Sequence, residues 1–425
     1  MTLALTNIGK IKNATVEING ITVIAGENDT GKSTVGKALF SVFNGFYDVK
    51  EQIRSVQVYS FKKKLDRIMA DENPEERSLV YSSGVANLVS EKIDEVENLS
   101  DVDLPSLISD AFSQNAKMYG FELKQLSENS LNQLSDIFRV NDDTIFQELL
   151  KNRFYSEFNG QISNIHSDKP GEIKLIIKDD SARIKVSDNE IIQLDDLLNL
   201  RTEAIYIDNP FVVDESLQGL RVNAWDGGYY YDHKSHLKSK LAKQKQDSNV
   251  INKILISNRF DDIFNKIGFS FEENPFERLR PMVQIKAASK TKSLSIKNLS
   301  TGIKTFLIIK TLLENETIEH GGTIILDEPE IHLHPEWQLL FAELIVLLQK
   351  EFGMHILLNT HSPYFLRAIQ VYSAKHEIAD KCKYYLADLI EDAAHIVDVS
   401  NDIDKIYEKL FLPFQKLEDD RWNND

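Results

Sequence analysis

The segment Gly26–Ser33, with the sequence GENDTGKS, constrains the fold of this chain more than any other part of it. It matches the pattern G-x4-G-K-[ST], in which backbone amides of a glycine-rich turn and of the next helix hold phosphate groups. The pattern requires a strand before it and a helix after it. The apolar run Ile21–Ala25 precedes it, and the helical pattern that follows has one apolar face at Val35, Ala38, Leu39 and Val42. The sequence therefore predicts an α/β fold with a phosphate-binding turn between a strand and a helix.

The residues of this turn have separate roles in binding a nucleotide and its metal ion. Lys32 reaches the β and γ phosphates, which makes it a catalytic as well as a binding candidate. The Ser33 hydroxyl is a predicted ligand of Mg²⁺. ATP and Mg²⁺ are therefore the predicted cofactors. The predicted nucleotide-binding residues of this segment are Gly26, Asn28, Gly31, Lys32, Ser33 and Thr34.

A second motif, Thr323–Pro329 (TIILDEP), is a β-branched apolar run that ends in two acids. Such a run predicts a buried parallel strand, with its carboxylates at the edge of the sheet where α/β folds bind ligands. Asp327 would hold Mg²⁺ there, directly or through water, and Glu328 would polarise the attacking water. The alternative is a strand that ends in two solvated acids, and the phosphate-binding turn weighs against it.

Two further segments each allow two interpretations. The segment Asn298–Lys304 (NLSTGIK) precedes a helical pattern, so Ser300 is either a plain N-terminal cap or, with the Gly302 amide, an anion site for a γ-phosphate. The segment Leu357–Pro363 (LLNTHSP) ends a strand pattern in a histidine. That residue, His361, is either structural or close to the γ-phosphate, if its strand follows the acidic strand in the same sheet.

The order of these four motifs resembles that of the ABC ATPase family. The resemblance implies that Ser300 and Gly302 contact the γ-phosphate bound by a second copy of the chain. It also implies that Glu328 is the catalytic base and His361 the switch histidine. Two ATP molecules would then lie between the heads of a symmetric homodimer. The implied fold is an ABC ATPase head, a P-loop NTPase with a mixed sheet core, an antiparallel β subdomain and helical insertions.

The segment Asp327–Pro335 (DEPEIHLHP) narrows this resemblance. Together with NTHSPYFLRAIQVY, it makes the chain similar to prokaryotic AAA-labelled ABC ATPases of the overcoming-lysogenization-defect (OLD) and SMC-like group. That group includes ATPase subunits of Septu-like, PARIS-like and retron-associated anti-phage defence systems. The resemblance implies a sensor or regulatory ATPase that controls a partner effector, a nuclease. OLD nucleases carry a Toprim domain after the ATPase, and the segment after the switch histidine is too short for one.

Two assignments rest on weaker patterns. Gln161 is the candidate for the family's Q-loop glutamine, which would make it a third magnesium ligand beside Ser33 and Asp327. His332 and His334 stand two residues apart, and they form either a metal pair or part of a loop that faces the second copy. The second interpretation is favoured.

Hydrophobic periodicity divides the chain into six segments. A predicted hairpin, EIKLIIKDDSARIKVSDNEI, marks the return from helical to strand patterns. The predicted segments are the first part of the ATPase head at 1–46, a helical insertion at 47–154, the β subdomain at 155–210, a second helical insertion at 211–265, the remaining head at 266–390 and a C-terminal tail at 391–425.

The formal net charge of −17 argues against a chain covered in nucleic-acid-binding surface. Two basic stretches, 234–245 and 278–304, leave room for local DNA contact. An SMC-like repair or recombination ATPase that clamps DNA is therefore the alternative function, and the nucleotide-binding subunit of a transporter is less favoured. No run reaches the ~20 apolar residues that cross a bilayer. With the single Cys382, this predicts a cytoplasmic protein without membrane contact. The homodimer, or a higher oligomer, is what the resemblance to ABC ATPases implies.

Overall fold

The computed structural model of the chain divides into two compact units. The head unit comprises the described residues within 1–47, 151–215 and 231–422, and the helical unit comprises those within Asp48–Leu150. The structure describes residues 1–72, 74–75, 82–95, 103–120, 125–215, 231–243, 260–270, 275–277, 282–287 and 290–422. Parts of the predicted insertion 211–265, together with Lys245, Arg278 and Arg280 of the basic stretches, lie outside these residues.

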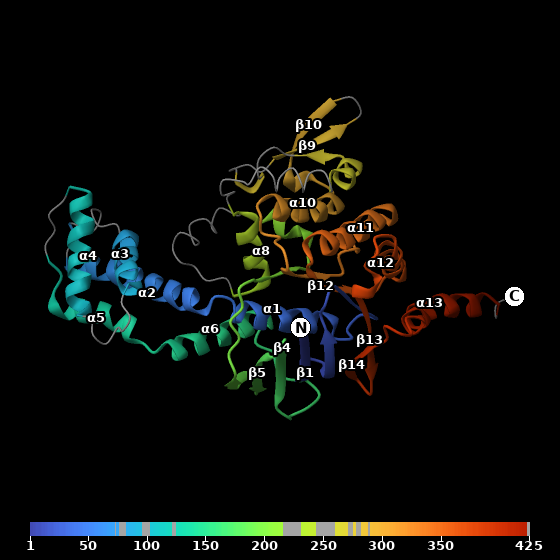
Figure 1. Cartoon of the computed structure of the whole chain (residues 1–425), viewed down its shortest axis with the longest axis horizontal. Helices are drawn as coiled ribbons and strands as arrows, with labels where there is room; N and C mark the ends of the chain where they lie inside the picture. Colours follow the sequence, from blue (N-terminus) through green and yellow to red (C-terminus); the bar gives the residue numbers. More distant parts are fainter. Residues whose placement is uncertain are drawn as a thin grey trace. The chain divides into compact units, whose positions relative to one another are not determined.

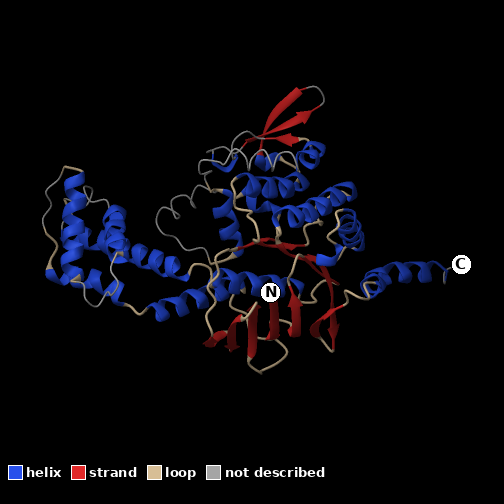
Figure 2. Ribbon diagram, viewed as in Figure 1, coloured by secondary structure: helices blue, strands red, loops and turns tan. Residues whose placement is uncertain are grey.

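The described part of the head unit is built on one eleven-stranded sheet, in the order β6-β5-β4-β1-β2-β14-β13-β3-β12-β11-β7. Figure 2 draws the strands in red and the helices in blue. Its strands are β1 (Thr2–Ile8), β2 (Ile11–Glu17), β3 (Ile21–Gly26), β4 (Gly171–Ile177), β5 (Asp180–Ser187), β6 (Glu190–Asp195), β7 (Ala204–Ile207), β11 (Thr323–Asp327), β12 (His355–Thr360), β13 (Cys382–Ile390) and β14 (Ala393–Asp398). A smaller sheet has the order β10-β9-β8, with β8 (Phe269–Ser270), β9 (Met282–Ala287) and β10 (Lys290–Ser295).

One half of the large sheet is parallel. The strands β13, β3, β12, β11 and β7 pair with one another in parallel register, and β3, β7 and β11 are buried along their whole length. Strands buried on both faces read as continuous apolar runs, which is why Ile21–Ala25 and Thr323–Leu326 could be recognised in the sequence. The predicted buried parallel strand before Asp327 is confirmed.

The other half of the sheet is largely antiparallel, from β6 to β2. Strands β4 and β5 form the predicted hairpin, which turns between Ile177 and Asp180. The burial of β5 alternates along the strand, as expected for a sheet with one solvated face. The predicted α/β class, a mixed sheet core with antiparallel strands and helical insertions, is confirmed.

Helices cover the parallel strands on both faces, and the two-residue period of a strand determines which side chain meets which helix. Ile21, Val23, Ile324 and Leu326 belong to one apolar cluster with α10, α11 and α12. Figure 1 shows these three helices together on one side of β12, with α1 on the other. The intervening residues Tyr206 and Ile325 meet Gly36 of α1.

The α-helices of the head unit that have described bounds are α1 (Lys32–Gly45), the end of α6 (Asp142–Glu157), α8 (His233–Leu241), α10 (Thr301–Glu314), α11 (Pro335–Phe352), α12 (Pro363–Lys375) and α13 (Asp404–Trp422). Short 3₁₀ helices lie at Pro210–Asp214, Pro275–Glu277, Ile296–Asn298 and Ala379–Lys381.

The helical unit has its own apolar core. It contains α2 (Val49–Glu72), α3 (Ser82–Asp94), α4 (Leu104–Met118), α5 (Glu128–Arg139) and the first part of α6. Phe61, Val89, Ile108, Leu134 and Phe138 are among the buried residues of this core. Asp103 and Ser127 cap α4 and α5, since each side chain accepts a backbone amide of the following turn. None of the described helices in either unit is long and apolar enough to cross a membrane.

Candidate nucleotide site

Three neighbouring parallel strands end at the same edge of the sheet. Asn359 of β12 is in register with Asp327 of β11 on one side and with Ile24 of β3 on the other. The turn after β3 and the acids after β11 therefore flank the end of β12. This confirms that the strand before His361 lies in the same sheet as the acidic strand and next to it.

The turn after β3 depends on two glycines. A Cβ on Gly26 would lie 2.2 Å from the carbonyl oxygen of Ala387, and a Cβ on Gly31 would lie 2.9 Å from a side-chain carbon of Ile11. Gly31 also has φ of 83°, which favours glycine. No other residue fits either position without a backbone shift.

Lys32 is the buried cation of the turn. Its side chain is 4% exposed, and Nζ donates to the carbonyl oxygens of Gly26 (3.1 Å) and Glu27 (2.7 Å). The same Nζ lies 3.5 Å from a carboxylate oxygen of Glu328. Ser33, the next residue, is exposed at the start of α1. The turn thus presents one ammonium group and one hydroxyl group at the sheet edge, as phosphate and Mg²⁺ binding requires.

Asp327 is held by two hydrogen bonds, one to each carboxylate oxygen. The Tyr206 hydroxyl donates to Oδ2 at 2.8 Å, and the Asn359 amide donates to Oδ1 at 3.0 Å. Asn359 also donates to the Lys32 carbonyl oxygen at 3.2 Å, so one side chain joins β12, β11 and the start of α1. Each oxygen of Asp327 keeps a lone pair. The Asp327 carboxylate and the Ser33 hydroxyl are oxygen donors of the kind that Mg²⁺ prefers, and the two fit a magnesium site.

Glu328 and His361 lie in contact beside Lys32. The Nδ1 atom of His361 lies 3.3 Å from Oε1 of Glu328. This contact with His361 and the charge of Lys32 lower the pKa of Glu328, while the contact with Glu328 raises the pKa of His361. Glu328 is a carboxylate in this setting, which is the state that a base needs. Its φ of 48° lies in the left-handed region, and its amide donates to the Asn359 carbonyl oxygen at 2.9 Å.

A third acid of the segment, Glu330, is buried rather than exposed to the site. Its side chain is 2% exposed and accepts a hydrogen bond from the Thr360 hydroxyl. Burial raises the pKa of Glu330, against the effect of this hydrogen bond. Thr360 in turn accepts the amide of Ser362, the N-terminal cap of α12. Glu330 was not among the residues predicted from the sequence, and it contributes to the turn that carries His361.

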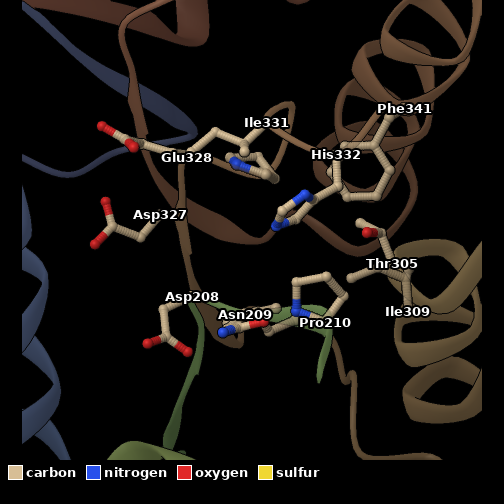
Figure 3. Close-up of a pocket in the computed structure, with 12 residues that line it drawn as sticks. Asp208, Asn209, Pro210, Thr305, Ile309, Asp327, Glu328, Ile331, His332 and Phe341 are labelled. Atoms are coloured by element: carbon tan, nitrogen blue, oxygen red, sulfur yellow. The ribbon is translucent and has the colours of Figure 1, made fainter. Parts of the chain in front are cut away.

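A pocket lies behind the strand ends, between β7, β11 and α10 (Figure 3). In Figure 3 the carboxylates of Asp208, Asp327 and Glu328 point to the same side, away from Thr305 and Phe341. Asp208 and the two residues after it were not predicted from the sequence. The sequence does contain a signal for this strand end. The short apolar run Ala204–Ile207 is followed by Asp-Asn-Pro, as the other strands of the site are followed by polar residues.

The sequence of the chain matches a family model described as the AAA ATPase domain over residues 1–366 of its 425. This chain belongs to the AAA ATPase domain family. The family assignment is consistent with the phosphate-binding turn and the paired acids that meet at the edge of this AAA ATPase domain. ATP is accordingly the nucleotide that we consider below.

More specific comparisons are partial or distant. An OLD nuclease of Thermus scotoductus is 33% identical over 103 residues, which cover 24% of this chain and only 19% of that relative. The alignment with the SMC head domain from Thermotoga maritima covers 94% of this chain and 98% of that chain. The sequence identity is 10% and the TM-score is 0.38. The alignment with the Smc head domain of Pyrococcus furiosus, solved bound to the C-terminal domain of ScpA, covers 96% of this chain and 98% of that chain. The sequence identity is 14% and the TM-score is 0.40.

Two predicted residues of this AAA ATPase domain lie at the start of α10. Ser300 occupies the N-cap position, but its side chain makes no cap hydrogen bond and the residue is exposed. Gly302 is buried, and a Cβ there would lie 3.0 Å from the Trp337 ring. None of the described contacts of Lys32 or Glu328 reaches these two residues, and their role at a γ-phosphate stays a prediction.

The remaining predicted ligands are also placed by the structure. Gln161 is exposed in the segment after α6, and its neighbour Ile162 accepts the amide of Gly9. Its assignment as a magnesium ligand stays a prediction. His334 caps α11, where its Nδ1 accepts the Glu336 amide at 3.4 Å, and His332 lines the pocket. Among the residues described, no group of three or more His, Cys, Asp or Glu side chains is arranged to hold a metal ion.

Proposed function

We propose that this AAA ATPase domain binds ATP with Mg²⁺ and hydrolyses it to ADP and phosphate. The observation that carries the proposal is the meeting of Lys32, Asp327 and Glu328 at one sheet edge, with His361 in contact with Glu328. Phosphoryl transfer depends mainly on positioning and on stabilising charge, and these side chains supply both. The chemistry of the family and the geometry of the edge thus support the same reaction.

Each side chain has one role in this scheme. Lys32 pairs with the β and γ phosphates, and Ser33 and Asp327 hold Mg²⁺, which when bound would neutralise charge on the phosphate oxygens. Glu328 accepts the proton of the attacking water and is kept ionised by Lys32 and His361. His361 follows β12 directly and contacts the γ-phosphate while it holds Glu328.

We further propose that Ser300 and Gly302 complete the site of a second copy. The Ser300 hydroxyl does not cap its own helix and is exposed, so it is available to a phosphate at the N-terminus of α10. Gly302 allows α10 to start close against Trp337 of α11. Two copies arranged with two-fold symmetry would bury two ATP molecules between them.

The biological role we propose is that of a cytoplasmic regulatory ATPase in a bacterial anti-phage defence system. ATP-driven association of two heads would switch a partner effector, a nuclease. The similarity of 103 residues to an OLD nuclease and the DEPEIHLHP segment support this role. The match covers 19% of that relative, so its nuclease activity is not carried over to this chain, and the partner nuclease is part of the proposal.

Measuring ATP hydrolysis and ATP binding by wild type and by Glu328→Gln tests the enzymatic proposal. The variant should lose hydrolysis by about 10²-fold or more, because the base is removed, while it still binds ATP. Glu336→Gln, at an exposed acid on α11, is the matched control and should behave as wild type. Wild-type protein that binds no ATP, or Glu328→Gln with unchanged turnover, would contradict the proposal.

A second candidate function is an SMC-like ATPase that clamps DNA. Lys292 and Lys297 are exposed within the stretch 278–304, and this favours local phosphate contact. In the other stretch Lys234, Lys238 and Lys240 are paired with Asp208, Glu215 and Glu203. DNA binding that weakens steeply with salt, and that is lost on Lys292→Glu with Lys297→Glu, would favour this candidate.

A further inference from the structure

A buried tyrosine contacts the carboxylate that we assign to Mg²⁺. Tyr206 lies on β7, the strand beside β11, and its side chain is on the face of the sheet that carries α1. Its hydroxyl donates to Oδ2 of Asp327 at 2.8 Å, and both residues are at most 9% exposed. A buried tyrosine hydroxyl requires a partner, and this one is satisfied by the functional carboxylate.

The α1 helix leaves space for this hydroxyl. At Gly36, one turn into α1, a Cβ would lie 3.1 Å from the Tyr206 oxygen and 3.1 Å from a methyl carbon of Ile325. Glycine inside a helix destabilises it relative to alanine, and the close contacts at Gly36 give a packing reason for a glycine here. That reason is the close approach of β7 and β11 to the helix that follows the phosphate-binding turn.

The ring of Tyr206 is fixed from its other side by a histidine. His233 stacks on it, with ring centroids 4.4 Å apart and an interplanar angle of 26°. His233 is hydrogen-bonded to Glu157 at 2.7 Å from Nδ1, and a carboxylate oxygen of Asp208 lies 3.1 Å from Nε2. Glu157 also accepts the backbone amide of His233 at 2.9 Å. The imidazole therefore has little freedom to move.

We propose that Tyr206 is a positioning residue for the magnesium carboxylate Asp327, and that His233, held by Glu157 at the end of α6, fixes the tyrosine ring. This inference rests on the proposed function, because it needs a metal ion at Asp327. Asn359 and Tyr206 together hold both oxygens of the carboxylate, and its remaining lone pairs would be available to a metal ion that Ser33 also binds. Outer partners that orient a ligand in this way change metal affinity by about 10–100-fold when they are removed.

The test measures metal affinity rather than turnover. Mn²⁺ replaces Mg²⁺, and electron paramagnetic resonance measures the concentration of free Mn²⁺. The protein carries Glu328→Gln, so that ATP is not consumed, and it is saturated with ATP. Tyr206→Phe, which deletes one oxygen atom, should weaken Mn²⁺ binding by roughly 10-fold. ATP affinity in the presence of a chelator should not change, because none of the described contacts joins Tyr206 to Lys32.

The matched control is Tyr385→Phe. Tyr385 is also buried, and its hydroxyl accepts the Glu17 amide at 2.9 Å, so the variant loses an equivalent hydrogen bond away from Asp327. Equal Mn²⁺ affinity in Tyr206→Phe and Tyr385→Phe would overturn the positioning role and leave the proposed function intact. Failure of the Glu328→Gln protein to bind ATP would instead overturn the proposed function.

The histidine is tested by a double-mutant cycle. His233→Gln leaves the Tyr206 hydroxyl in place, so it should weaken Mn²⁺ binding by a smaller factor than Tyr206→Phe does. If His233 acts through the tyrosine, the histidine substitution should have almost no added effect once Tyr206 is phenylalanine. Full additivity of the two effects would overturn the link between His233 and Asp327.

Discussion

The charge state of Glu328 is set by its neighbours and not by its position in the sequence. A glutamate at the end of a strand would ordinarily titrate near its usual value in water. Here His361 and Lys32 lie within 3.5 Å of its carboxylate and lower its pKa. The effect of this pairing is to keep the proposed base ionised at mildly acidic pH.

We therefore predict that His361→Gln moves the acid limb of the ATP hydrolysis profile to higher pH. The substitution removes the largest cause of the lowered pKa of Glu328, so the base becomes protonated, and inactive, at a higher pH than in wild type. Rate measurements across the acid range, with His376→Gln on α12 as the control, test this. An acid limb that stays in place would show that His361 does not hold Glu328 ionised.

A second residue-scale prediction concerns the pH dependence of stability. Burial alone lowers the pKa of His233, but Asp208 and Glu157 outweigh it and raise the pKa from 6.5 to about 9. A raised pKa means that the ion pairs contribute fully below pH 6.5 and are lost as the pH rises towards about 9. The thermal unfolding temperature should fall across this window in wild type and much less in His233→Gln. Substitution of the exposed His166 by Gln should leave the wild-type slope unchanged.

At the scale of elements, α1 and β7 are joined by one asparagine. The Asn44 side chain donates to the Ala204 carbonyl oxygen at 2.9 Å and accepts the Ala204 amide at 2.6 Å, and both bonds are buried. Two backbone groups at the start of β7 are thus satisfied by a helix. The pairing fixes β7, and with it Tyr206 and Asp208, relative to the phosphate-binding turn.

We expect Asn44→Leu to destabilise the protein by about 2–4 kcal/mol. The substitution leaves a buried amide and a buried carbonyl without partners, and each costs roughly 1–3 kcal/mol. Chemical unfolding measures the difference in the free energy of unfolding between the variant and wild type. The control is Asn13→Ala, at an exposed asparagine on β2, which should stay within about 0.5 kcal/mol of wild type. If Asn44→Leu lowers the free energy of unfolding as little as Asn13→Ala does, β7 is held by other contacts.

At the scale of the whole molecule, the proposed site is divided between two copies. Lys32 and Ser300 belong to the same chain, but in a symmetric dimer each ATP would meet Lys32 of one copy and Ser300 of the other. A variant at either position should therefore be inactive by itself. Mixed dimers of the two variants would contain one site in which both residues are wild type.

This arrangement predicts complementation. Lys32→Ala and Ser300→Arg should each lose ATP hydrolysis, and an equal mixture should regain about a quarter of the wild-type rate, since half of the dimers are mixed and each has one intact site. A mixture of Lys32→Ala with Glu328→Gln is the control and should stay inactive, because both positions belong to the same half-site. Absence of recovery in the first mixture would contradict a shared site.

Much of the parallel half of the fold was predictable from the sequence. The apolar runs before Gly26 and Asp327 are buried parallel strands, as their composition predicts, because a strand covered on both faces needs no polar alternation. The face of α1 at Val35, Ala38, Leu39 and Val42 is buried as its spacing predicts. The division of the chain into six segments stays a prediction, as does the shared dimer site.

The sequence by itself determined the phosphate-binding turn and the paired acids, because their chemistry depends on residues that are consecutive along the chain. Only the tertiary structure decided which distant side chains support them. Tyr206 lies 121 residues from Asp327 along the chain, and Asn359 lies 32 residues from it. Tyr206 carries no local pattern, since a tyrosine in an apolar strand has the sequence of a core residue. Asn359 lies in the motif LLNTHSP, but the motif does not show that its side chain contacts Asp327. Strand order brings them together, because β7, β11 and β12 end side by side and direct alternate residues to the face of α1.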